Sequence, residues 1–262
     1  MISIDLSNKN AIVSGASKGI GKAIALSLAE CGASVVLLAR DGNLLQNCRD
    51  ELSTFKNQKH QILIVDFDEP EDLKIKVTNL LKDLKVHILI NNTGGPPAGK
   101  AILSEPSQFE SAFRQHLICN QILVQSVLNS MKEQSYGRII NIISTSVKQP
   151  LDNLGVSNTI RGAVANWSKT LANELGQFNI TVNNVLPGAT LTSRLEAIIE
   201  KESNLQNKSI SEITSQMLNT IPMKRFALPL EIANVVAFLA SPLASYINGI
   251  NLPVDGGRTK SL

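Results

Sequence analysis

A glycine-rich turn near the start of the chain has the pattern of a phosphate-binding site. Residues 11–13 form a short apolar run typical of a strand, and residues 20–30 have the periodicity of a helix. Between them stands Ser14-Gly15-Ala16-Ser17-Lys18-Gly19-Ile20-Gly21. Glycines let backbone N–H groups approach a pyrophosphate, and the following helix presents its positive end to the negative charge. Glycines alone often mark only turns, but strand, glycine turn and helix in this order predict a dinucleotide site.

The residues after the second apolar run, 35–38, indicate which dinucleotide binds. A carboxylate at this place would accept a hydrogen bond from a ribose 2′-hydroxyl, as in NAD sites. Here Arg40, with Lys18 of the glycine turn, offers cationic donors to a 2′-phosphate. Asp41 fits NAD(H) instead, and Arg40 could be a solvated loop charge. We predict NADP(H) as the cofactor, with NAD(H) as the alternative.

Three further features could act on a substrate. Ser144 follows the apolar run 139–143, and the carboxyl end of a strand in an open α/β sheet faces the ligand crevice, although Ser144 could simply cap a turn. Residues 94–99, Gly-Gly-Pro-Pro-Ala-Gly, suggest either a rigid wall beside a ligand or an ordinary loop. Arg194 could meet an anionic group such as a carboxylate or a carrier's phosphopantetheine, or be a surface charge.

These residues must be positioned by a regular alternation of short and long segments. Apolar runs of strand length occur at 11–13, 35–38, 62–65, 86–90, 139–143, 181–186 and 250–252. Helical periodicity occurs at 20–30, 70–84, 105–131, 155–175 and 230–240. Nearly continuous apolar strands separated by helices predict an α/β fold with an open, doubly wound parallel sheet. Residues 196–216 are polar, and we predict a mobile flap there.

Length and composition restrict the domains, the partners and the compartment. A chain of 262 residues with 43% hydrophobic residues suits one domain over residues 1–262. The net charge of +3 without a basic cluster excludes nucleic acid and anionic membrane surfaces as expected partners. Three cysteines and three histidines, all scattered, predict neither a disulfide framework nor a metal site. Residues 1–6 are too short for a secretory signal and no apolar run could span a bilayer, so we expect a soluble cytoplasmic protein.

Motifs along nearly the whole chain resemble those of the short-chain dehydrogenase/reductase family. They are the glycine turn, Asp66, Asn91-Asn92-Thr93-Gly94, Ser144, Pro187-Gly188-Ala189-Thr190-Leu191-Thr192 and Val254-Asp255-Gly256-Gly257. The chain length and the segments 137–141 and 222–225 are most similar to the β-ketoacyl carrier-protein reductase group. The resemblance implies a Rossmann-type fold of about seven parallel strands. It also implies a homotetramer, or a homodimer, built through the helices predicted at 105–131 and 155–175.

The resemblance also implies a set of cofactor contacts. The phosphates and the adenosine ribose would be held by the glycine turn and the residues after the second strand, namely Gly15, Ser17, Lys18, Gly19, Ile20, Gly21 and Arg40. Asp66 and Phe67 would lie near the adenine, and Asn92 and Gly94 near its ribose. The nicotinamide would be surrounded by Pro187, Gly188, Thr190 and Thr192.

The catalytic positions depart from the pattern that the resemblance implies. Family members that reduce carbonyls use a Ser to hold the oxygen, a Tyr as general acid, a Lys four residues later, and an Asn on the preceding long helix. Counting from Ser144 places Ser157 at the Tyr position and Arg161 at the Lys position, and His116 stands at the Asn position. A serine hydroxyl is too weak an acid to replace tyrosine, and arginine holds its proton too firmly to exchange it. Neither of the two tyrosines of the chain falls at the site.

Three interpretations of this altered site remain. In the first, the protein reduces a ketone, 3-oxoacyl-like or other and possibly carrier-bound. Ser144 and Ser157 bind its oxygen, Arg161 stabilises the developing alkoxide, and His116 or water supplies the proton, since histidine ordinarily titrates near neutral pH. In the second, hydride adds to the β-carbon of an α,β-unsaturated carbonyl, the same residues hold the enolate, and solvent protonates it. In the third, the chain is a catalytically retired dinucleotide-binding protein or regulatory subunit. His116 could equally be a structural histidine, and Ser157 could merely fill the volume of the missing tyrosine.

Overall fold

Seven parallel strands form one sheet in the computed structural model, which describes residues 3–261. Residues 1, 2 and 262 lie outside the described part of the chain. They include the two ends of the predicted domain and the first two residues of the segment 1–6, which was judged too short for a secretory signal. The strand order is β3-β2-β1-β4-β5-β6-β7. The strands are β1 (Asn10–Ser14), β2 (Ser34–Ala39), β3 (Gln61–Ile64), β4 (Ile88–Asn91), β5 (Gly137–Ile142), β6 (Ile180–Pro187) and β7 (Asn251–Val254). The predicted Rossmann-type, doubly wound α/β fold is confirmed.

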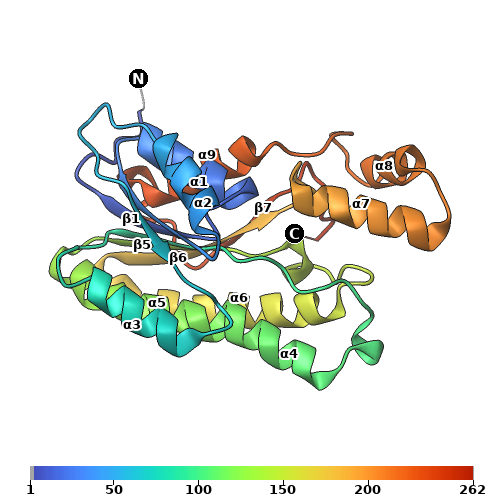
Figure 1. Cartoon of the computed structure of the whole chain (residues 1–262), viewed down its shortest axis with the longest axis horizontal. Helices are drawn as coiled ribbons and strands as arrows, with labels where there is room; N and C mark the ends of the chain where they lie inside the picture. Colours follow the sequence, from blue (N-terminus) through green and yellow to red (C-terminus); the bar gives the residue numbers. More distant parts are fainter. Residues whose placement is uncertain (1–2, 262) are drawn as a thin grey trace.

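Helices cover both faces of this sheet (Figure 1). One layer contains α1 (Gly19–Glu30), α2 (Gly42–Asp50) and α9 (Pro229–Ala240), and the other contains α3 (Pro70–Leu80), α4 (Pro106–Phe113), α5 (Cys119–Glu133) and α6 (Gly155–Leu175). Successive strand residues point to opposite faces, so Val13 joins the apolar cluster under α1 and Ile12 the cluster under α5. Both faces are therefore buried, which is why the strands are apolar throughout.

A ladder of asparagine side chains crosses four strands of the sheet. Asn91, Asn141, Asn184 and Asn251 stand opposite one another on β4, β5, β6 and β7. Each amide donates to the next side-chain oxygen, at 2.8, 2.9 and 2.7 Å in that order. A shift of one residue would turn these amides to the other face and leave buried polar groups unpaired. The ladder therefore specifies the register of the strands that carry the ligand end of the sheet.

Two predicted segments differ from the structure. The helix predicted over residues 105–131 is divided into α4 and α5 by a π-helical stretch, η2 (Arg114–Ile118). The polar segment predicted as a flap forms two helices, α7 (Ser193–Gln206) and α8 (Ile210–Asn219). These helices enclose a small apolar cluster of their own, formed by Leu195, Ile199, Ile213, Ile221 and Phe226. The segment contains few apolar residues, so its sequence has only a weak helical pattern and was predicted as a flap. The mobility of the segment stays a prediction.

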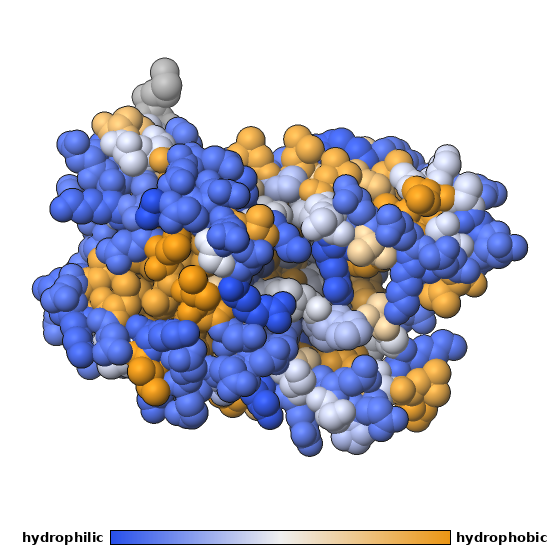
Figure 2. Space-filling view, in the orientation of Figure 1, coloured by the Kyte–Doolittle hydropathy of each residue, from blue (hydrophilic) through white to orange (hydrophobic). Residues whose placement is uncertain are grey.

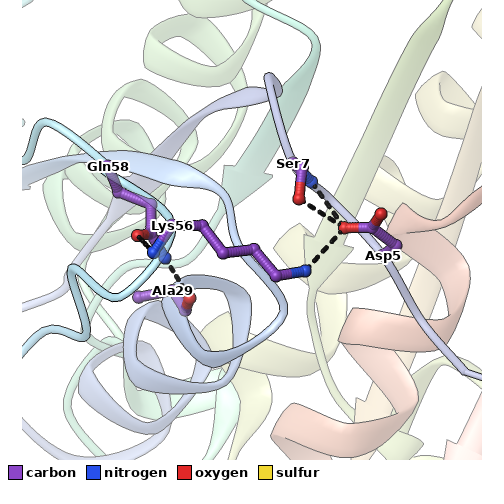
Figure 3. Close-up of polar contacts among 5 residues, drawn as sticks. All are labelled: Asp5, Ser7, Ala29, Lys56 and Gln58. Atoms are coloured by element: carbon purple, nitrogen blue, oxygen red, sulfur yellow. Dashed lines mark hydrogen bonds and ion pairs between the residues drawn. The ribbon is translucent and has the colours of Figure 1, made fainter.

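The segment before β1 is fastened to the loop between α2 and β3 (Figure 3). Lys56 Nζ lies 2.9 Å from Asp5 Oδ1, which also accepts from the N–H and the hydroxyl of Ser7. From the same loop, Gln58 Nε2 donates to the Ala29 carbonyl near the end of α1, at 2.8 Å. The Ser7 and Lys56 hydrogen bonds hold the pKa of Asp5 well below its usual range. Solvent screens this exposed pair, so it orients the chain more than it stabilises it.

None of the helices within residues 3–261 combines the length and the apolar character that crossing a bilayer requires.

Candidate active site

The glycine turn lies where the order of the strands reverses, between β1 and β4. Gly15 and Gly19 have φ of +59° and +58°, a left-handed conformation that glycine adopts without strain. Gly21 has an ordinary backbone, but a Cβ there would lie 2.1 Å from the Gly15 carbonyl oxygen. Asn92, after β4, donates its backbone N–H to Ser14 Oγ at 2.9 Å and directs its amide nitrogen to the Ser14 and Gly15 carbonyls, both at 3.3 Å. The three glycines thus form a concave turn at the start of α1 that only small residues can make.

The residues predicted to contact the adenosine end lie at the carboxyl ends of β2 and β3. Arg40 directly follows β2, and its Nη1 lies 4.0 Å from Asp66 Oδ2, with both side chains largely exposed. Phe67 is partly buried against the core beside Asp66. Asp41, the residue that fits NAD(H), accepts a hydrogen bond from the Leu44 N–H at 3.0 Å and caps α2. The Asp41 carboxylate therefore has a structural role as a helix cap. The Arg40 guanidinium remains exposed to solvent.

The segment after β6 is folded against the glycine turn. Pro187 ends β6, and Thr190 Oγ1 donates to the Gly188 carbonyl at 3.0 Å. Thr192 Oγ1 donates to the Thr190 carbonyl at 3.2 Å and also caps the first turn of α7. The Thr192 methyl group lies 3.3 Å from where a Cβ on Gly19 would stand. The segment predicted to surround the nicotinamide thus approaches the glycine turn predicted to hold the phosphates.

His116 is buried inside the π-helical stretch. Its side chain is 1% exposed, and Nδ1 is 2.5 Å from Thr93 Oγ1, after β4. Its Nε2 makes no well-formed hydrogen bond within residues 3–261, although the Gly94 backbone is close enough to favour protonation slightly. Burial, and then the charge of Arg161, lower the pKa of His116 to about 2. The imidazole is therefore neutral at physiological pH. The proposed role of His116 as proton donor had assumed an ordinary histidine pKa near neutral pH, and the structure does not support that assumption.

The depressed pKa of His116 makes stability depend on pH in one direction. The unfolded chain takes up a proton near the ordinary value of 6.5, while the folded chain resists protonation down to about 2. Stability is therefore full above pH 6.5 and is lost as the pH falls from 6.5 toward 2, by up to about 1.4 kcal/mol per pH unit. We expect His116→Asn to flatten the fall in the urea-derived free energy of unfolding between about pH 7 and about pH 5. An unchanged slope would contradict a neutral, buried imidazole.

A second histidine serves as the comparison in that experiment. Burial lowers the pKa of His87 to about 4, so His87 adds a loss of the same sign as the pH falls. His87 accepts the Asn10 N–H at the amino end of β1, away from His116. We expect His87→Asn to flatten the slope between about pH 7 and about pH 5 nearly as much as His116→Asn, because both folded pKa values lie below this window, and the two effects to add. Below about pH 4, where folded His87 also takes up its proton, of these two histidines only His116 should continue to lower the free energy of unfolding.

Arg161 projects from α6 into the interior and is 7% exposed. Its Nη1 donates to the Ile142 carbonyl at the end of β5, at 3.2 Å, and its Nε has no hydrogen-bond partner within residues 3–261. None of the acidic side chains in this part of the chain forms an ion pair with it. Burial, and then the charge of Arg194, lower the pKa of Arg161 to about 10. The group remains a cation at neutral pH, buried and without a counter-charge.

One serine lies on the same helix as this arginine, and the other precedes a short helix that packs on it. Ser144 directly precedes the short helix η3 (Thr145–Val147), which packs on α6, and its Oγ accepts the Ser146 N–H at 3.1 Å. Ser157 lies one helical turn before Arg161 on α6 and is partly exposed. Because η2 packs against the same helix, His116 and Arg161 lie close enough for the charge of one to affect the other. Ser144, Arg161 and His116 thus come from three elements that meet on α6.

The two tyrosines lie elsewhere. Tyr136 precedes β5 at the amino end of the sheet, where its hydroxyl donates to the Ala240 carbonyl at 2.7 Å. Tyr246 lies before β7 and is fully exposed. Sequence reasoning did not identify Thr93 as the partner of His116, nor the Ile142 carbonyl as the partner of Arg161. No local signal could have done so, because both contacts join residues from separate strands and helices.

The chain matches known proteins along nearly its whole length. Residues 15–259 match the family model described as enoyl-(acyl carrier protein) reductase. The chain belongs to the short-chain dehydrogenase/reductase family. Its similarity to individual members extends over whole chains and is accompanied by the strand order and glycine turn described above.

Members of the short-chain dehydrogenase/reductase family that resemble this chain include several reductases. It is 30% identical to the NADPH-dependent reductase BacG of Bacillus subtilis, over 98% of this chain and 100% of BacG. It is 33% identical to the 3-oxoacyl-[acyl-carrier-protein] reductase FabG of Vibrio cholerae, over 97% of this chain and 98% of that protein. The crystal structure of L-sorbose reductase from Gluconobacter frateurii with NADPH and L-sorbose superposes with a TM-score of 0.93, at 29% identity and complete coverage of both chains.

Proposed function

We propose that this protein is an NADP(H)-dependent oxidoreductase that reduces a carbonyl group with a non-standard proton donor. The observation that carries the proposal is Arg161, a buried cation that forms no ion pair within residues 3–261. It donates to the Ile142 carbonyl at the carboxyl end of β5, two residues before Ser144. A structural arginine would have its N–H groups satisfied by hydrogen-bond partners, whereas a buried cation with an unsatisfied N–H suits a reaction in which an oxyanion develops. Similar chains whose names state NADPH-dependent reduction support the same class of reaction.

The residues around the glycine turn fit NADP(H). The concave turn at Gly15, Gly19 and Gly21 would receive the pyrophosphate at the start of α1. The exposed Arg40 guanidinium, with Lys18, would receive the 2′-phosphate, and Asp41 is occupied in capping α2. The remaining predicted contacts, which come from Ser17, Ile20, Asp66, Phe67, Asn92, Gly94, Pro187, Gly188, Thr190 and Thr192, complete the proposed site. When bound, the cofactor supplies hydride.

In the proposed mechanism the protein holds the substrate oxygen and stabilises the charge that forms on it. Ser144 and Ser157 donate hydrogen bonds to the carbonyl oxygen, and Arg161 stabilises the developing alkoxide. Arg161 keeps its own proton at neutral pH, because its pKa is about 10. Neutral His116, whose pKa is about 2, is not a source of an imidazolium proton. We therefore assign proton delivery to water and give His116 the role of orienting the loop at Thr93 and Gly94.

Conjugate reduction of an α,β-unsaturated carbonyl is the second candidate. It is favoured by the same neutral His116, since protonation of an enolate carbon by solvent needs no acidic side chain. Ser144, Ser157 and Arg161 would hold the enolate oxygen as they would hold an alkoxide. The description of the matching family model, an enoyl reductase, is consistent with this chemistry.

Absorbance assays of NADPH oxidation test both candidates. The full chain is first titrated with NADPH by fluorescence and then assayed with an acetoacetyl thioester, an aromatic ketone and an α,β-unsaturated ketone. We expect oxidation by at least one ketone, and oxidation by the enone alone would indicate conjugate reduction. NADPH binding without turnover, restored by the double change Ser157→Tyr and Arg161→Lys, would instead show a retired dinucleotide-binding protein.

Assembly and location complete the proposal. We propose a homotetramer or homodimer built through α4, α5 and α6, a cytoplasmic location, and a small-molecule substrate that can be carrier-bound. Size-exclusion chromatography with light scattering tests the assembly directly.

A further inference from the structure

Two arginines from different helices meet beside the loop of residues 94–99. A Cβ built on Gly95 would lie 3.5 Å from Arg194 Nη2 and 3.9 Å from Arg161 Nη2. Both guanidinium groups therefore come within 4 Å of one point on the surface of this loop. Arg161 reaches it from the interior on α6, and Arg194 from the first turn of α7. The two positive charges repel each other, which contributes to the lowered pKa of Arg161.

No acidic side chain within residues 3–261 pairs with either arginine. The other buried arginine of the chain shows what a structural role looks like. Arg138 is 1% exposed, and it donates to the carbonyls of Gly137, Asn179 and Ser241 while stacking on Tyr136. Arg161 in contrast leaves its buried Nε without a partner. A buried cation beside a second cation is unfavourable unless an anion joins them.

Contacts with the loop hold Arg194 in this position. Its Nη2 donates to the Pro96 carbonyl at 2.8 Å, and Lys201 on the same helix donates to the Ala98 carbonyl at 3.2 Å. Two prolines limit the freedom of this loop, so the arginine is anchored to a stiff support. In the space-filling view a hollow lies between the α7–α8 segment and α4 (Figure 2). The two guanidinium groups are therefore held in place before a ligand binds.

We propose that Arg161 and Arg194 together bind a carboxylate of the substrate, so that the substrate class is a keto acid or the corresponding unsaturated acid. The inference rests on the proposed reductase function, because it places this anion next to Ser144 and the reacting carbonyl. Guanidinium groups bind planar carboxylates through paired N–H donors, and such charge-assisted bonds are stronger than neutral ones. The anion would also relieve the repulsion between the two arginines.

Calorimetric titration of the full chain, with and without NADP+, tests the proposal independently of turnover. The ligands are phenylglyoxylate and its methyl ester, which differ in charge next to the ketone. We expect the dissociation constant of the acid to be lower than that of the ester by about tenfold or more. Arg194→Met should remove this preference, whereas Lys208→Met, at an exposed position after α7 that does not contact the loop, should keep it.

A third variant blocks the site without removing a charge. Gly95→Ala has room in the structure, with its Cβ at ordinary contact distance from both arginines. We expect Gly95→Ala to keep the melting temperature of the parent protein and to weaken binding of the acid more than of the ester. Retained preference for the acid in this variant would contradict binding at that point.

The outcomes separate this inference from the proposed function. Equal binding of acid and ester, or no binding of the acid, overturns the carboxylate site, and so does tighter binding of inorganic phosphate than of the acid. NADPH oxidation by neutral ketones as fast as by keto acids also overturns it, while the reductase function stands. Charge-dependent binding that Arg194→Met abolishes, without oxidation of NADPH by any ketone or enone, supports the anion site and contradicts the reductase.

Discussion

Arg161→Gln should lower kcat/KM for NADPH-dependent reduction about 100- to 1000-fold, measured with the ketone that the parent protein reduces fastest. The expected loss is large because Arg161 is a buried cation, and we propose that it stabilises the charge developing on the substrate oxygen. Glutamine keeps a polar amide but is neutral and shorter than arginine, so the substitution removes the charge together with the hydrogen bond to the Ile142 carbonyl. Arg161→Lys should retain part of the activity, since it keeps the charge but not the planar arrangement of donors.

The matched control for this result is the second buried arginine. Arg138 lies at the amino end of β5, where backbone carbonyls satisfy its guanidinium. We expect Arg138→Gln to lower the free energy of unfolding but to leave kcat/KM of the folded protein unchanged. If both glutamine variants lost activity in proportion to stability, Arg161 would be only structural.

Gly21→Ala should lower the free energy of unfolding by about 3 kcal/mol and weaken NADPH binding. Its Cβ would lie 2.1 Å from the Gly15 carbonyl oxygen and 2.6 Å from Asn92 Nδ2, so the first turn of α1 must move away from β1 and β4. This movement would open the concave turn at Gly15, where the pyrophosphate is proposed to bind. Urea unfolding and NADPH fluorescence titration measure the two effects.

Gly162 is the matched control for this substitution, because a Cβ at this glycine has free space around it. It lies inside α6, and within residues 3–261 a Cβ built there has no heavy atom within 4 Å apart from its chain neighbours and the backbone of its own helix. Gly162→Ala should therefore raise the free energy of unfolding by about 0.5 to 1 kcal/mol, because alanine restricts the unfolded chain and favours helix. A Gly21→Ala protein as stable as the parent would show that the turn can open without cost.

Local patterns predicted most of the secondary structure because burial on both faces leaves a clear signal. The seven apolar runs are all strands, and four of the five helical segments are single helices. The exceptions occur where the apolar pattern is weak or where two kinds of helix have the same pattern. Residues 105–131 keep a continuous apolar pattern through the π-helical stretch, which changes the hydrogen bonding but not the composition. The polar segment of α7 and α8 buries only a small cluster, so it resembled a loop.

Sequence alone predicted the doubly wound sheet and the glycine turn, and the family resemblance led us to interpret Ser157 and Arg161 as standing at its Tyr and Lys positions. Those features depend on residue type and spacing along the chain, which are visible without coordinates. Only the tertiary structure decided the chemical state of the site. It buried His116 far enough to lower its pKa to about 2, and it left Arg161 without an ion pair to any acidic side chain within residues 3–261. It also brought Arg194 to Gly95 from the first turn of a helix that the sequence did not reveal. Solvation and charge pairing depend on which separate elements meet, and that is a property of the folded chain.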